Sequence, residues 1–125
     1  VTGADLVGES VLTIDEQHLY HKQVSDLCES LGATVNRDFE GTSLDTLRQM
    51  VVMGMGISFL PALYVASEIG DSDTPRITDV QGVTMSRDHA LAWRRRSPSR
   101  VNFRQLADAI REVVKVDLAG EVTLI

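Results

Sequence analysis

The sequence predicts an α/β fold with a largely parallel sheet. Strand candidates fall at residues 9–14, 34–40 and 57–60, and the first and last of them contain short apolar runs. Amphipathic segments with helical spacing follow the first two candidates, and another fills residues 99–115. Strands that alternate with helices of about ten or more residues are typical of parallel sheets, because each crossover needs a helix.

Length and composition fit one ordinary globular domain. The chain has 125 residues, of which 43% are hydrophobic and 24% charged. Twelve basic residues against 18 acidic ones give a net charge of −6, which repels nucleic acid unless the basic residues are segregated. No apolar run approaches the roughly 20 residues that span a bilayer. We therefore expect a cytoplasmic protein that contacts neither a membrane nor, through this chain, DNA.

The first half of the chain carries the clearest helix and strand signals. Residues 2–7 suit one helical turn, and residues 9–14 follow as a strand. From residue 18 to residue 31 one face of a helix is apolar, and Gly32 ends it. The apolar positions of that face are Tyr20, Val24, Leu27, Cys28 and Leu31.

A second strand and helix follow at once. After the strand at residues 34–40, Thr42 is predicted to cap a helix, with Asp45 reaching back to complete a capping box. Gly54 suits the left-handed end of that helix, and Gly56 lets the backbone pass closely before the strand at 57–60. Pro61 closes the strand and opens a short helix over residues 61–66.

The second half is less regular. Residues 67–75 have no periodicity and predict a surface loop, and residues 76–80 and 89–94 are strand candidates. The helix at 99–115 carries an apolar stripe that includes Phe103, Leu106 and Ile110. The tail from residue 117 to 125 is read either as a final strand or as a frayed end.

A family resemblance rests on the segment from Thr42 to Pro61. Its Thr-Ser-Leu-Asp-Thr-Leu-Arg, Gly-x-Gly-Ile and Leu-Pro motifs resemble the effector-binding domain of LysR-type transcriptional regulators, most closely the hydrogen-peroxide-inducible (OxyR-type) activators. The likeness runs from about residue 4 to residue 115.

The resemblance implies a periplasmic-binding-protein-like domain with a ligand cleft between two α/β subdomains. Residues 1–85 would form most of the second subdomain, and residues 86–125 would supply a crossover strand and the C-terminal helix of the first. An N-terminal DNA-binding domain would be absent from this sequence. The implied partners are a small-molecule or oxidant effector and further copies of the protein, as a homodimer or tetramer. DNA would be bound only through a missing N-terminal helix-turn-helix.

The candidate ligand-binding residues are Thr42, Ser43, His18, Leu19, Gly56 and Arg87. Thr42 and Ser43 offer hydroxyls beside the free N–H groups of a helix start, which suits an anion, although Thr42 is equally read as a simple cap. His18 is either a wall of the pocket or an exposed helix-start residue. Arg87 either neutralises an anion in the cleft or is solvated.

The redox chemistry of the peroxide branch is placed in doubt by two positions. Where the resemblance expects the reactive cysteine after His18, this chain has Leu19, which has no thiol. Cys28 matches the position of the second cysteine, and it is the only cysteine, so no internal disulfide is possible. We interpret Cys28 as a buried, inert thiol, with a one-cysteine sensor that forms sulfenic acid as the alternative.

Other functions receive less support. We identify no catalytic set, no metal-ligand spacing and no cofactor motif, so an enzyme is not predicted. A solute-binding protein of a transporter would share the same kind of cleft and is the alternative. The run Arg94-Arg95-Arg96 has no interleaved aromatic residues, which favours a solvated turn or an oligomer surface over a nucleic-acid patch.

Overall fold

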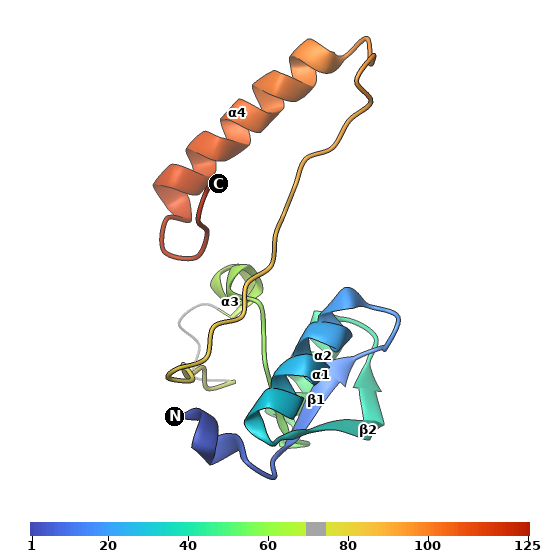
Figure 1. Cartoon of the computed structure of the whole chain (residues 1–125), viewed down its shortest axis with the longest axis vertical. Coiled ribbons are helices and arrows are strands. Elements are labelled where there is room, and N and C mark those ends of the chain that lie inside the picture. Colours follow the sequence, from blue (N-terminus) through green and yellow to red (C-terminus); the bar gives the residue numbers. More distant parts are fainter. Residues whose placement is uncertain (70–74) are drawn as a thin grey trace. The chain divides into compact units, whose positions relative to one another are not determined.

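The computed structural model describes residues 1–69 and 75–125 (Figure 1). These residues form two compact units, Val1–Met85 and Ser86–Ile125, which are described separately. The assignment of the two units to two subdomains of an effector domain stays a prediction.

The first unit is built on a small parallel sheet. Its strands are β1 (Ser10–Ile14), β2 (Thr34–Gly41) and β3 (Ile57–Ser58), in the order β2-β1-β3. β1 pairs in parallel with both neighbours, with Ile14 opposite Gly41 and Leu12 opposite Ser58. The predicted α/β architecture is confirmed.

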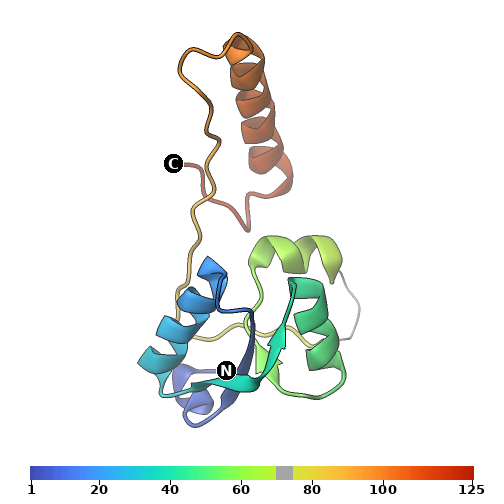
Figure 2. The same cartoon turned by 90° about the vertical axis from the view of Figure 1, so that its right-hand side faces the viewer.

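Two helices cover the opposite faces of this sheet. Figure 2 shows the strands between α1 (Leu19–Leu31) and α2 (Leu44–Val52). Because both faces of β1 are covered, all its residues from Val11 to Ile14 are buried, which explains its continuous apolar run. The buried cluster consists of Val11, Leu12, Ile14, Tyr20, Val24, Cys28, Ala33, Leu47 and Met50.

Glycines set the ends of both helices as predicted. Gly32 and Gly54 have φ angles of 70° and 76°, in the left-handed region where a side chain is disfavoured. Gly56 lies against the core, since a Cβ there would meet Leu12 Cγ at 3.2 Å. The close backbone passage expected at Gly56 is therefore present.

Two short helices complete this unit. The predicted first turn is the 3₁₀ helix η1 (Gly3–Leu6), in which the Asp5 carboxylate accepts hydrogen bonds from the Thr2 N–H at 2.7 Å and the Thr2 hydroxyl at 2.9 Å. The second is α3 (Ala62–Glu68), for which Pro61 is the N-cap. The loop predicted over residues 67–75 is therefore wrong at its start, and its residues 70–74 lie outside the described part of the chain.

The strand predictions fail where no neighbouring strand is available. Residues 76–80 and 89–94 form no strand. Next to the first of these segments, Gln81 makes only an isolated bridge with Thr2. β3 also ends at Ser58, earlier than the predicted Leu60. Strand propensity alone does not suffice, because a strand exists only where a partner satisfies its backbone N–H and C=O groups.

The second unit centres on α4 (Arg100–Asp117), which follows a turn closed by the Ser97 N–H donating to the Arg94 carbonyl at 3.0 Å. The predicted helix is confirmed, but Ala107 is its only buried residue. Leu106 and Ile110 remain 53% and 40% exposed. Of the two readings of the tail, residues 118–125 form turns and irregular chain rather than a strand. Among the described residues, no helix is long and apolar enough to cross a membrane.

Candidate functional site

The carboxyl ends of the three parallel strands meet at one edge of the sheet. β1 occupies the centre, and the chain leaves it first for β2 on one side and later for β3 on the other. Open α/β sheets bind ligands at the carboxyl edge, at the point where the strand order reverses in this way. The residues that follow the strands here are Asp15 to His18, Thr42 with Ser43, and Phe59.

The loop after β1 leads into α1 through a tight hydrogen-bonded turn. The Asp15 N–H donates to the Gly41 carbonyl at 3.0 Å, which extends the β1–β2 pairing by one residue. The His18 N–H donates to the Asp15 carbonyl at 3.1 Å, and His18 is the N-cap of α1. The His18 side chain makes no capping bond and is exposed, and the next residue, Leu19, is 68% exposed. Both side chains are therefore accessible at this edge.

The loop after β2 forms the start of α2 with a cluster of hydroxyl groups. Ser43 caps the helix, because its Oγ accepts from the Thr46 N–H at 3.2 Å. The Thr42 and Thr46 hydroxyl oxygens lie 3.3 Å apart. The predicted cap at Thr42 is thus wrong by one residue, and Thr42 is exposed with its hydroxyl beside the cap. The turn also depends on Gly41, where a Cβ would meet the Leu47 nitrogen at 3.2 Å.

Asp45 joins the start of α2 to α3 instead of completing a capping box. Its carboxylate accepts a hydrogen bond from the Tyr64 hydroxyl at 2.7 Å and lies 4.0 Å from Arg48 Nε. Burial raises the pKa of Tyr64, and the bond to Asp45 acts in the same direction. The capping box fails because the cap is Ser43, which leaves Asp45 at the second helical position rather than the third.

Two residues of the first turn of α1 hold the strand ends in place. The Tyr20 hydroxyl donates to the Phe59 carbonyl just after β3, and His21 Nδ1 lies 2.9 Å from the Ile14 carbonyl at the end of β1. Sequence reasoning placed Tyr20 on an apolar face and assigned His21 no role here. The sequence signal for these two residues is their position in the first turn of the helix that follows β1.

Two of the other predicted site residues lie away from this edge within the first unit, and the third belongs to the second unit. Gly56 precedes β3, at its amino end, where it packs on Leu12. Cys28 is in the core, and burial raises the pKa of its thiol. Arg87 is an exposed residue of the second unit. The structure therefore brings His18, Leu19, Thr42 and Ser43 to the carboxyl edge, and does not bring Gly56 or Cys28 there.

Hydroxyl groups, an imidazole and the N–H groups of a helix start can donate hydrogen bonds to an anion. In the described ranges 1–69 and 75–125, no group of three or more His, Cys, Asp or Glu side chains is arranged to hold a metal ion. The fold thus defines the unit as a parallel α/β domain with a polar carboxyl edge.

Comparison with known families identifies the class more narrowly. The family model of the LysR substrate binding domain matches residues 1–115. The chain belongs to this family, and the predicted resemblance to LysR-type regulators is confirmed.

Individual relatives agree with the peroxide branch. The chain is 36% identical over 115 residues to a hydrogen peroxide-inducible genes activator of Haemophilus influenzae. The aligned residues cover 92% of this chain and 38% of that protein. It is 39% identical over 112 residues to the protein of that name from Pectobacterium carotovorum, covering 90% of this chain and 37% of the relative. The DNA-binding transcriptional dual regulator OxyR of Escherichia coli is 38% identical over 108 residues, covering 86% and 35%. The chain thus spans less than two fifths of the relatives that it matches. No solved structure matches it.

Proposed function

We propose that the Val1–Met85 unit binds a small-molecule effector at the carboxyl edge of its sheet, as the effector-sensing part of a LysR-type transcriptional regulator. The observation that carries the proposal is the exposed hydroxyl cluster of Thr42, Ser43 and Thr46 at the start of α2, directly after β2. A carboxylate or similar anion would accept hydrogen bonds there from hydroxyls and helix N–H groups, at the favourable end of the helix dipole.

The proposed binding of an effector differs from thiol-based peroxide sensing, which needs a reactive cysteine. The relatives are named for induction by hydrogen peroxide, but the residue after His18 is Leu19, and the one cysteine is 1% exposed in the core. A buried thiol with a raised pKa holds little of the reactive thiolate. Reversible binding is therefore favoured over oxidation of Cys28.

Regulation would follow from a shift of populations. An effector that binds one arrangement of the domain more tightly than another favours that arrangement, by an amount equal to the difference in binding free energy. We propose that this shift alters a homodimer or tetramer, and that DNA is contacted through a helix-turn-helix outside the present sequence. A solute-binding protein of a transporter is the competing function. The coding sequence upstream separates them, since a signal peptide there would exclude the regulator.

The binding site is tested by thermal unfolding in the presence of a panel of small carboxylates and oxyanions. A compound at about 100 times its Kd stabilises the folded state by about 2.7 kcal/mol, so we expect a clear rise in Tm. Thr42→Val should abolish that rise while changing the Tm of the unliganded protein little, because Ser43 and not Thr42 caps α2. Thr84→Val, at an exposed threonine outside the site, is the matched control and should keep the full response. A full response in Thr42→Val would place the ligand elsewhere.

A further inference from the structure

The basic residues of this acidic chain are concentrated in its second unit. Residues 86–125 contain eight arginines and lysines against five aspartates and glutamates, whereas the whole chain has a net charge of −6. Five arginines fall within residues 94–104 alone. Segregation of charge produces a local positive potential that attracts anions despite the overall charge.

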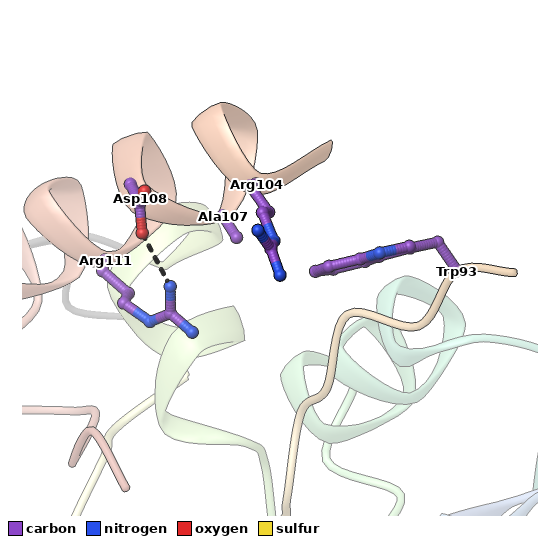
Figure 3. Close-up of a pocket in the computed structure, with 5 residues that line it drawn as sticks. All are labelled: Trp93, Arg104, Ala107, Asp108 and Arg111. Carbon is purple, nitrogen blue, oxygen red and sulfur yellow. Dashed lines mark hydrogen bonds and ion pairs between the residues drawn. The ribbon is translucent and has the colours of Figure 1, made fainter. Parts of the chain in front are cut away.

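Two aromatic rings flank the run Arg94-Arg95-Arg96, which itself contains none. Trp93 lies next to Phe103, with ring centroids 6.1 Å apart and planes inclined at 38°. Two hollows of the second unit share Trp93 in their walls. One, of about 590 Å³, is lined by Ala92, Trp93, Arg94, Arg96, Ser97, Pro98 and Phe103. The other, of about 300 Å³, is lined by Trp93, Arg104, Ala107, Asp108 and Arg111 (Figure 3).

The smaller hollow contains one guanidinium group that is available to a ligand. Arg111 is engaged, because its Nη1 donates to Asp108 at 2.9 Å. Arg104 has no carboxylate partner among the described residues, and Figure 3 shows its side chain directed toward the space between Ala107 and the Trp93 ring. Ala107, 4% exposed, forms an apolar floor, whereas Trp93 is 36% exposed. The hollow thus combines a flat aromatic wall, a small apolar floor and an unneutralised cation.

We propose that this hollow binds a single planar aromatic ring that carries a phosphate or carboxylate group. The ring would stack on Trp93, and the anionic group would pair with the Arg104 guanidinium, whose planar array of N–H donors matches both anions. The ion pair of Asp108 with Arg111 is electrically balanced and would border the site without opposing the anion. All the residues that line this hollow belong to the second unit, whereas the effector site is proposed on the first.

Trp93 is the only tryptophan of the chain, so its fluorescence reports on a ligand bound against its ring, and the variants below assign that ligand to the hollow of Arg104. The probe is phenyl phosphate, titrated into the full chain. Inorganic phosphate, which has no ring, and benzyl alcohol, which has no charge, are the comparison compounds. We expect a saturable change of fluorescence with phenyl phosphate at concentrations where neither comparison compound produces one.

Two arginine variants locate the anionic group. A hydrogen bond to a charged partner contributes about 1.5–3 kcal/mol, so Arg104→Gln should weaken the binding of phenyl phosphate about tenfold or more. Arg100→Gln removes the same charge from the same helix outside the hollow and should weaken binding by no more than roughly twofold, as expected for a screened surface charge. Circular dichroism checks that both variants keep α4.

Three results would overturn the proposal. Equal affinity for inorganic phosphate and phenyl phosphate would mean that positive charge alone attracts the anion. Equal weakening by Arg104→Gln and Arg100→Gln would mean that the anion is not held at Arg104. Absence of saturable binding of phenyl phosphate, both by fluorescence and by equilibrium dialysis, would exclude the site.

Discussion

Cys28 is 1% exposed and packs in the same buried cluster as Val24 and Leu12. Desolvation disfavours its thiolate and raises its pKa in the folded state. The folded-state pKa therefore exceeds that of the unfolded chain. The stability that the neutral thiol contributes is complete below the unfolded-state pKa, and it is lost as the pH rises from that value through the folded-state pKa.

The direction of this pH dependence gives a testable prediction for Cys28. The free energy of unfolding of the natural chain should fall more between neutral pH and pH values above the unfolded-state thiol pKa than that of Cys28→Ala, which has no thiol to ionise. Urea unfolding curves at the two pH values measure the difference.

In the folded chain at neutral pH, hydrogen peroxide should not add the mass of an oxygen atom to Cys28, as measured by intact mass spectrometry. Rapid oxidation that disappears in Cys28→Ser would restore the one-cysteine sensor.

At the scale of one element, the N-cap of α2 is Ser43, whereas the sequence predicted Thr42. Ser43 Oγ accepts from the Thr46 N–H, whereas Thr42 only approaches the Thr46 hydroxyl. Replacing an N-cap serine by alanine costs about 1 kcal/mol, so Ser43→Ala should lower the free energy of unfolding by that amount. Thr42→Ala should stay within about 0.5 kcal/mol of the natural chain, as exposed substitutions usually do. Urea denaturation measures the free energy of unfolding of both variants. A larger loss in Thr42→Ala than in Ser43→Ala would mean that Thr42 is the cap.

The helix ends show which features local sequence determines. Gly32 and Gly54 were predicted as helix terminators, and both adopt the left-handed conformation that the prediction requires. The cap of α2 was misplaced by one residue because Thr42 and Ser43 are adjacent hydroxyl residues with similar capping preference. The backbone path from β2 through Gly41 determines which of the two hydroxyls bonds to the helix. That path is a property of the folded unit.

The strands and the candidate site show what depends on tertiary structure. The run at residues 76–80 has strand propensity but forms no strand, because propensity does not supply a partner. His18 and Thr42 lie at one edge because each follows a strand of a parallel sheet, whose strands share a carboxyl edge. The bonds from Tyr20 to Phe59 and from His21 to Ile14 depend on how α1 is rotated against the sheet. Periodicity gives the apolar face of a helix but not such individual contacts.

At the scale of the whole molecule, the two units differ in how much they bury. The first contains nearly all the buried apolar residues, with β1 between two helices, whereas α4 in the second buries only Ala107. Most helical stability in proteins comes from packing of the apolar face, and an isolated helix is marginal in water. We therefore expect the amide hydrogens of β1 to exchange only on global unfolding of the first unit. Those of α4 should exchange through local openings that cost far less free energy.

Hydrogen exchange followed by mass spectrometry, with peptides covering Ser10–Ile14 and Arg100–Asp117, measures the protection of both segments. Equal protection of the two segments at low protein concentration would contradict this expectation. Protection of α4 that rises with protein concentration would instead show that association between chains buries its apolar face.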